Sequence, residues 1–188
     1  MSSKPVASNS SPLIWLARIG RLTLLKILFR QVIVPKKVYE EAALQKQSAD
    51  AILISKAVEE GWVKISEERT EEAEALAGVS GIHSGEAEAI LLAQKIGADL
   101  IVDEREASAT AQMFEVRCIG TVAVLLLALA RDQMTLQEFK ESVDSLIASG
   151  FWLTVDVYNR VMEEAEIISG KKDCLLYTSD AADEEDSV

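Results

Sequence analysis

The segment SGEAEAILLAQKIGADLIVDE, residues 84–104, decides the fold class of this chain. Ser84 can cap a helix over Gly85–Ile96, and Gly97 can end it, because glycine readily adopts the left-handed conformation that follows many helices. The residues Asp99–Asp103, DLIVD, then predict a short strand with an apolar core and an acidic end. A helix that leads into a continuously apolar strand is typical of a parallel sheet covered by helices on both faces.

The same alternation of short apolar strands and helices extends along the rest of the chain. We expect further strands at Pro5–Ser8, Gln31–Val34, Trp62–Ser66, Val116–Ile119 and Phe151–Leu153, and helices at Leu13–Ile19, Leu22–Phe29, Ser48–Gly61, Arg105–Phe114, Val122–Ala130, Thr135–Gly150 and Val155–Ile167. The predicted fold class is therefore α/β, a three-layer α/β/α arrangement around a short parallel sheet.

Acidic and amide side chains gather where this arrangement places the carboxyl ends of the strands, which is where open parallel sheets bind ligands. Two carboxylates about 5 Å apart repel by roughly 3 kcal/mol at an effective dielectric of about 20, so such a cluster requires a cation or protons. Asp103 and Glu104 close one strand, Glu86 and Glu88 lie in the first turn of the Ser84-capped helix, Glu40 and Glu41 follow Gln31–Val34 by about two helical turns, and Asn9 ends the first strand.

The composition limits the chemistry of this site. His83 is the one histidine, and the two cysteines, Cys118 and Cys174, lack the spacing of zinc ligands. A metal site would therefore use oxygen ligands, which favours Mg²⁺ or Mn²⁺ over zinc. We interpret His83 as a loop residue rather than a catalyst.

The chain is acidic, with a formal charge of -12, and five of the acids fall in its last fifteen residues. The charge that remains without them, about -7, still argues against a generic nucleic-acid binder, since backbone binding rests on cations that neutralise phosphates. From Cys174 the run CLLYTSDAADE looks like the translated transposon end of a sequencing adapter. We interpret the residues from Cys174 onward as an assembly artefact, with an acidic disordered tail as the alternative. The domain is expected over residues 4–168 and the tail over 169–188.

Four motifs in this order resemble the PIN superfamily of metal-dependent ribonucleases, in a prokaryotic subgroup described as predicted nucleic-acid-binding proteins and related to VapC-type toxins. They are ASNSSPLIWLARIGRLTLL, VIVPKKVYEEA, SGEAEAILLAQKIGADLIVDE and VRCIGTVAVLL, and the resemblance covers roughly Val6–Glu166. It implies a PIN-like, Rossmann-like fold and an Mg²⁺- or Mn²⁺-dependent endoribonuclease, which could be the toxin of a toxin–antitoxin pair.

The resemblance also assigns site residues. Glu41, Glu88 and Asp103 match the second, third and fourth functional acids, and with Asn9 they make up the expected metal ligands. Asn9 stands where the family normally has Asp, which predicts weaker metal binding or a site that no longer cuts. Glu86 and Glu104 neighbour the matched acids, and whether Asp103 or Glu104 is the ligand stays open. Thr121 matches a small hydroxyl position near the site.

Three other functions compete with that of a ribonuclease. A PIN-like module that binds nucleic acid or protein without catalysis is the alternative, because of Asn9. A phospho-receiver ranks lower, since no lysine follows Val116–Ile119, and no G-x-G-x-x-G motif supports a dinucleotide enzyme. The expected partners are an RNA substrate, an antitoxin protein and a second copy in a homodimer, the last two because Leu13–Leu28 is apolar.

No stretch reaches the roughly 18 to 20 apolar residues of a membrane span. The N-terminus has no basic region followed by a long apolar run, so no signal peptide is expected. We therefore expect a cytoplasmic protein without membrane contact.

Overall fold

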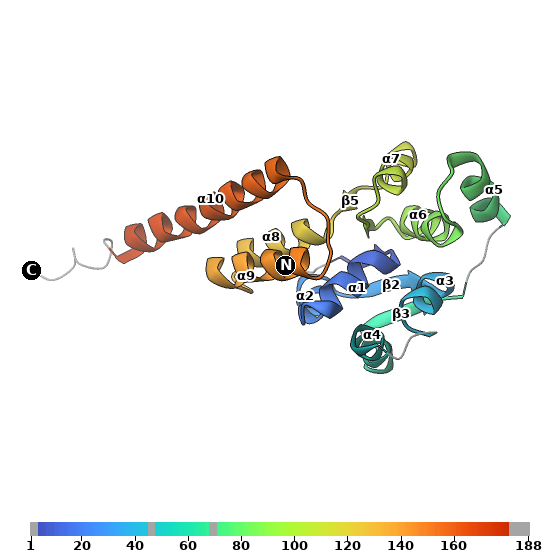
Figure 1. Cartoon of the computed structure of the whole chain (residues 1–188), viewed down its shortest axis with the longest axis horizontal. Coiled ribbons are helices and arrows are strands. Elements are labelled where there is room, and N and C mark those ends of the chain that lie inside the picture. The colour runs from blue at the N-terminus through green and yellow to red at the C-terminus, as the bar shows by residue number, and fades with distance from the viewer. Residues whose placement is uncertain (1–3, 45–47, 68–70, 181–188) are drawn as a thin grey trace, which may run out of the picture. The chain divides into compact units, whose positions relative to one another are not determined.

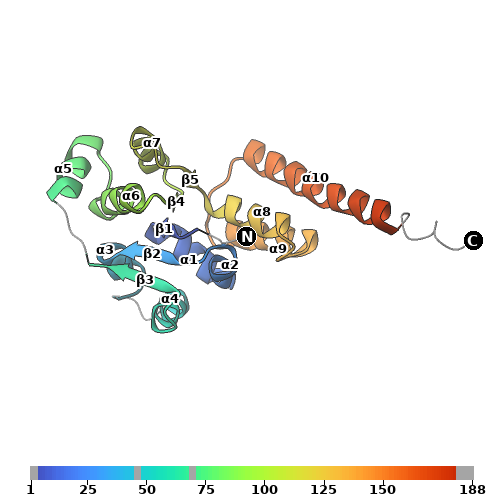
Figure 2. The same ribbon diagram turned by 180° about the vertical axis from the view of Figure 1, so that it is seen from behind.

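The computed structural model describes residues 4–44, 48–67 and 71–180, with the backbone alone over 171–180. By its internal contacts the chain divides into two compact units, residues 1–124 and residues 125–188. The first unit holds one sheet of five parallel strands in the order β3-β2-β1-β4-β5 (Figures 1 and 2). The strands are β1 (Val6–Ser8), β2 (Val32–Pro35), β3 (Val63–Ser66), β4 (Asp99–Ile101) and β5 (Cys118–Ile119). The predicted α/β class with a helix-covered parallel sheet is confirmed.

The helices between the strands lie on both faces of the sheet. Those between β1 and β3 are α1 (Ser10–Arg18), α2 (Thr23–Leu28), α3 (Lys36–Tyr39), the π-helix η1 (Glu40–Leu44) and α4 (Ala49–Glu59). Those between β3 and β5 are α5 (Glu71–Ser80), α6 (Ser84–Ile96) and α7 (Arg105–Met113). Figures 1 and 2 show α6 and α7 on one side of the sheet and α4 on the other.

The order of the strands creates a point where the direction of the chain reverses. From β1 the chain moves to β2 and β3, and then returns past β1 to β4 and β5. Since parallel crossovers are right-handed, the two directions place their helices on opposite faces. The neighbours β1 and β4 are therefore the topological switch point, where the helices diverge and leave a crevice beyond the carboxyl ends of the strands.

Strand alternation places the core side chains. Ala7, Leu100 and Val102 pack with Ile90 and Ala93 of α6 in one buried cluster. Burial of both sheet faces explains why the strands are apolar throughout instead of alternating with polar residues.

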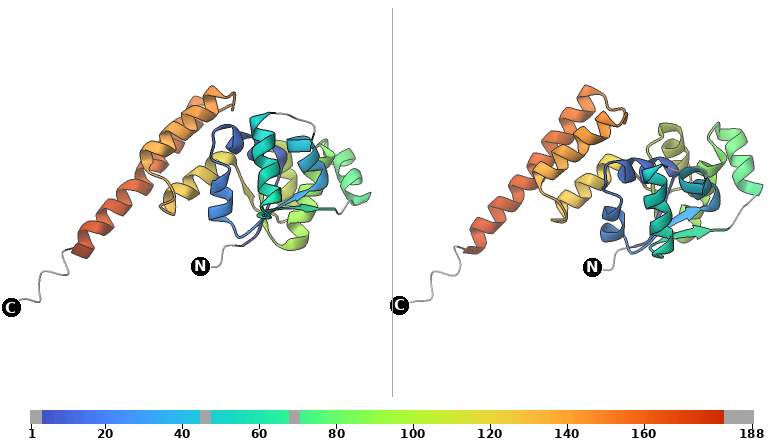
Figure 3. Two further views of the ribbon diagram at one scale, coloured as in Figure 1. Left: turned by 90° about the horizontal axis from the view of Figure 1, so that it is seen from below. Right: turned by 60° about the horizontal axis from the view of Figure 1, so that its bottom comes forward.

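The second unit is helical. The helix α8 (Thr121–Ala130) begins in the first unit and continues into the second, which also contains α9 (Leu136–Ala148) and α10 (Val155–Asp180). Thr135 caps α9 as predicted, since its hydroxyl accepts from the backbone N–H of Glu138 at 3.2 Å, and the Glu138 carboxylate accepts from the Thr135 N–H at 2.8 Å. Figure 3 shows α9 and α10 side by side.

Two predictions for this unit are wrong. Phe151–Leu153 is not a strand, because a segment that pairs with no sheet edge has no partner for its backbone N–H and C=O groups. The last helix does not end near Ile167 but continues to Asp180, since one glycine, Gly170, costs only about 1 kcal/mol in a helix. The predicted tail, residues 169–188, lies partly outside the described residues.

The apolar stretch Leu13–Leu28 serves mainly as core. Leu13, Leu16 and Leu25 are fully buried, and the large apolar side chain that is mainly exposed here is Ile27, at 53%. The interface predicted from the composition of this stretch therefore loses its main support.

Within the described residues, no helix combines the length and apolar character needed to cross a membrane.

Candidate active site

The switch point places Asn9 beside the end of β4. The backbone N–H of Asn9 donates to the Ile101 carbonyl at 2.9 Å, which continues the β1–β4 ladder one residue past Ser8. This bond fixes the backbone of Asn9 at the mouth of the crevice. On β4 the chain continues directly into Asp103 and Glu104, so three polar side chains predicted for the site come from adjacent strand ends.

Asn9 and Glu104 are in direct contact. The Asn9 Nδ2 donates to one Glu104 carboxylate oxygen at 3.2 Å, and the Ser11 hydroxyl donates to the other in a short hydrogen bond. Asn9 is only 2% exposed, and its Oδ1 is a buried oxygen without a hydrogen-bond partner in the described residues. Rotating the amide would turn Oδ1 toward the Glu104 carboxylate, so the charge of Glu104 fixes the orientation of Asn9.

Asp103 is held by the first residue of α8. Its two carboxylate oxygens accept from the Thr121 N–H at 2.7 Å and from the Thr121 hydroxyl at 2.6 Å. A Cβ at Gly120 would lie 3.4 Å from the nearer carboxylate oxygen, so a glycine here leaves room for this approach. Burial raises the pKa of Asp103, the two Thr121 hydrogen bonds partly offset that rise, and Glu104 adds to it.

Glu86, rather than its matched neighbour Glu88, interacts with the acids of this centre. It is 7% exposed, and its carboxylate accepts from the His83 N–H at 2.7 Å. Burial raises the pKa of Glu86, the His83 hydrogen bond lowers it, and the charges of Glu104 and Glu41 raise it further. Glu86 is therefore electrostatically coupled to acids from the elements after β2 and after β4. The helix begins one residue earlier than predicted, with His83 rather than Ser84 as its N-cap.

Glu41 reaches the first turn of α6 from the π-helix η1. A Cβ at Gly85 would lie 3.8 Å from a Glu41 carboxylate oxygen, and the Glu41 side chain is exposed. Helix precedes Glu41 as predicted, but α3 has four residues and widens into a π-helix at Glu40. Such π-turns often occur at functional sites, where they change the direction of a side chain.

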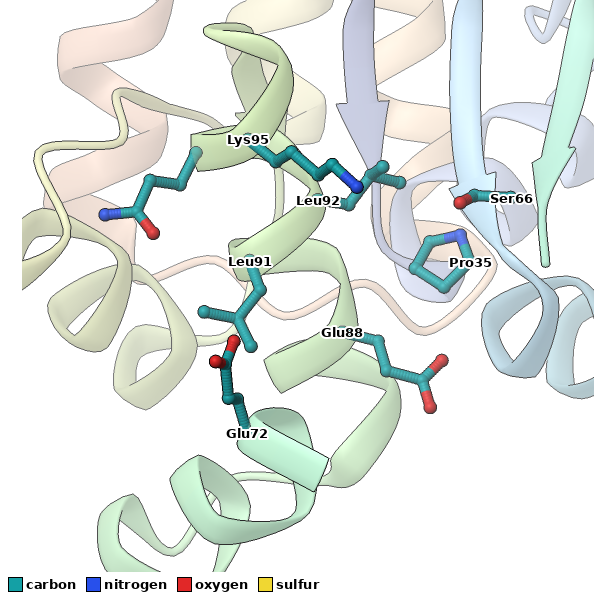
Figure 4. A pocket seen from close by; sticks show the side chains of 8 residues that line it. Pro35, Ser66, Glu72, Glu88, Leu91, Leu92 and Lys95 are labelled. Atoms are coloured by element: carbon teal, nitrogen blue, oxygen red, sulfur yellow. The ribbon is translucent and has the colours of Figure 1, made fainter. Parts of the chain in front are cut away.

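Glu88 lies on another face of α6. It lines a cavity of about 330 Å³ together with Pro35 and Ser66, the last residues of β2 and β3. Figure 4 shows Glu88 and Lys95 projecting from α6 on the side of these two strand ends. The structure therefore brings Asn9, Asp103, Glu104 and Glu86 toward the switch point, and places Glu88 in a separate cavity.

A family model described as a PIN domain matches residues 5–167. The chain belongs to the PIN domain family. The match spans most of the chain and agrees with the resemblance of the four motifs. Among curated proteins, a search gave no significant match. The strand order also separates this PIN domain from a phospho-receiver, whose order is 2-1-3-4-5.

The chain's own residues fit a divalent ion in part. Mg²⁺ and Mn²⁺ prefer carboxylate and amide oxygens, and the buried Asn9 Oδ1 is such an oxygen, without a partner, beside a carboxylate. However, the part of this PIN domain that the structure describes contains no group of three His, Cys, Asp or Glu side chains that could hold a metal ion. The donor chemistry therefore fits, while the carboxylates do not converge into a three-acid site.

Sequence reasoning missed two supporting residues, Ser11 and Gly120. Ser11 lies two residues after Asn9, a spacing that does not place two side chains on the same face of a helix. Its acceptor, Glu104, lies 93 positions away in the sequence. Gly120 could have been found, since a glycine between a strand and a helix often allows a close approach of another group to the backbone.

Proposed function

We propose that this PIN domain is a metal-dependent endoribonuclease whose active site is the β1–β4 switch point. The observation that supports it most is the contact of buried Asn9 with half-buried Glu104, with Asp103 and Glu86 in the same acidic centre. Asn9, Glu86 and Glu104 would hold Mg²⁺ or Mn²⁺, with Asp103 beside them. A bound ion of this kind activates water and stabilises the charge that develops on a cleaved phosphodiester.

Each residue has a task that follows from its contacts. Ser11 and Asn9 hold the two oxygens of Glu104 in place, and Thr121 holds those of Asp103. Burial and the charges of Glu104 and Glu41 raise the pKa of Glu86, so a bound divalent ion would offset the cost of its charged form. We keep Glu41 as a ligand candidate and replace Glu88 by Glu86, since Glu88 lines another cavity.

The test is cleavage of RNA by the full chain with Mn²⁺ and with excess chelator. We expect cleavage with Mn²⁺ alone, and its loss in Asp103→Asn. In that variant an amide oxygen can still accept from the Thr121 N–H, so the fold is expected to survive. Cleavage by Asp103→Asn at the parent's rate, or no binding of Mn²⁺ at millimolar concentration, would sink the proposal.

A non-catalytic PIN module is the second candidate, and one observation favours it. The Asn9 amide donates a hydrogen bond to Glu104, which an ionised carboxylate at this position could not do. Glu104 therefore has a donor without any cation. Metal binding without cleavage would make this function the better one. A role as a VapC-type toxin, an antitoxin partner, a homodimer and a cytoplasmic location remain predictions from the resemblance and composition.

A further inference from the structure

Cations are arranged unevenly around the acidic centre. Four basic side chains of the first unit contact carboxylates: Arg18 with Asp50, Lys26 with Glu60, Lys36 with Glu67 and Arg117 with Asp99. Lys37 and Arg105 are exposed as well, but neither has an ion pair in the described part of the chain. A chain of charge -12 that binds RNA needs such uncompensated cations near its site.

Lys37 lies against the first turn of α6. It lines a shallow pocket of about 400 Å³ with Glu41 and His83, among others. A Cβ at Gly85 would lie 3.9 Å from the Lys37 Cγ, so the aliphatic part of Lys37 packs over this turn. The Lys37 side chain therefore begins beside Glu41, on the side of the acidic centre that is nearer to β2.

Arg105 lies where the helix dipole opposes its charge, between the acids Glu104 and Glu106. It is the first residue of α7 and directly follows Glu104. A cation at a helix N-terminus is unfavourable by about 0.3–1 kcal/mol, because the helix dipole is positive there. No ion pair in the described residues offsets this cost. A bound ligand with negative charge would offset it.

The two cations lie on opposite sides of Asn9 in the topology. Lys37 follows β2, Arg105 follows β4, and β1 lies between these strands in the sheet. A polyanion that crosses the strand ends over Asn9 would therefore meet one cation before the acids and one after them.

We infer that Lys37 and Arg105 bind phosphates of single-stranded RNA on the two sides of the acidic centre. The identity of the ligand rests on the proposed function. The acids repel the phosphate at the centre until a cation offsets their charge, so attraction must come from the flanking phosphates. Binding of this kind does not depend on base sequence and weakens with salt.

The inference is tested by fluorescence anisotropy of a labelled oligouridylate, titrated with the full chain over a series of salt concentrations in excess chelator. Without metal, binding is measured apart from cleavage. Lys37→Ala and Arg105→Ala should each reduce the slope of log affinity against log salt by about 0.7, and the double variant by about 1.4. Lys36→Ala and Arg117→Ala are matched controls, because their side chains pair with Glu67 and Asp99 and should leave the slope unchanged.

Slopes for Lys37→Ala and Arg105→Ala equal to those of the controls would overturn the inference, as would a parent that binds no RNA at low salt. The result is separable from the proposed function. A chain that shows the slope changes but never cuts RNA keeps the inference and fails as a nuclease. If the chain cuts RNA while all four variants share the parent's slope, the proposed function holds and the inference fails.

Discussion

The carboxyl edge of the sheet has two regions, each with its own acidic side chains. At β1 and β4 the acids are held by neighbours: Glu104 by Asn9 and Ser11, and Asp103 by Thr121. At β2 and β3 the strand ends border an open cavity lined by Pro35, Ser66 and leucines of α6, into which Glu88 projects (Figure 4). The chain reverses direction at the first region and not at the second, so the topological switch point lies at the first.

The helix α6 supplies one acid to each region. Glu86 is in phase with Ile90 and Ala93, which are completely buried, whereas Glu88 is in phase with Leu91 and Lys95, which line the cavity. A displacement of two residues rotates a helical side chain by more than half a turn. Two glutamates that are neighbours in a motif thus line different parts of the structure.

The sharpest test of this difference compares Glu86→Gln with Glu88→Gln in Mn²⁺-dependent RNA cleavage. We expect Glu86→Gln to reduce the rate at least about a thousandfold, because residues that act as one catalytic unit fail together. Glu88→Gln should stay within a few-fold of the parent. Gln at position 86 can still accept from the His83 N–H, so the substitution removes the charge and keeps the helix cap.

Two results of that comparison would reverse our view. If Glu88→Gln is the slower variant, the assignment by resemblance is right and the separate cavity belongs to the active centre. If both variants cut like the parent, Glu86 is buried only to cap α6.

The second prediction concerns the neutral residue of the β1–β4 region. Asn9→Asp places a second carboxylate against Glu104, where Nδ2 now donates at 3.2 Å. We expect the free energy of unfolding in metal-free buffer to fall by about 3 kcal/mol, because a buried charge is left without a compensating partner. Added Mn²⁺ should restore part of this loss, and its stabilising effect should exceed that on the parent.

Urea unfolding with chelator and with Mn²⁺ measures both effects. Asn9→Ala is the control, since it removes the hydrogen bond without adding charge and should cost about 1 kcal/mol, with no added response to Mn²⁺. Equal stability of Asn9→Asp and the parent in chelator would mean that the crevice is more hydrated than its burial indicates.

Much of this arrangement is predictable from the sequence, for local reasons. The strands at Pro5–Ser8, Gln31–Val34 and Asp99–Asp103 were predicted within one or two residues, because buried parallel strands are short apolar runs. The convergence of Asn9 with Glu104 was also predicted, since both follow parallel strands.

The remainder depends on tertiary structure that local patterns do not encode. The pairing of β1 with β4 crosses 93 residues of chain, and nothing near Asn9 indicates that neighbour. The choice between Glu86 and Glu88 was open to helical periodicity, but the resemblance favoured Glu88 and gave Glu86 only a supporting place. Phe151–Leu153 has the composition of a strand, and its failure to form one reflects the absence of a pairing edge, which sequence does not reveal.

The smallest effect we expect is a gain in stability. Glu86→Gln should slightly raise the free energy of unfolding in metal-free buffer at pH 7. The native pKa of Glu86 is raised, first by burial and then by Glu104 and Glu41, so deprotonation costs more in the folded state than in the unfolded chain. The parent therefore loses stability as pH rises above about 4.5 and through the native pKa, and the advantage of the variant should vanish near pH 4.

Thermal or urea unfolding of both proteins across this range measures the difference, and Glu60→Gln is a control of opposite sign. The hydrogen bond from Lys26 and that from Trp62 lower the pKa of Glu60, so its removal should cost stability at pH 7 and not well below the ordinary glutamate pKa. A Glu86→Gln variant that is less stable than the parent at pH 7 would show that the carboxylate is stabilised where it lies. The acidic centre would then need no cation, and the contrast with the open cavity at β2 and β3 would be one of packing rather than of charge.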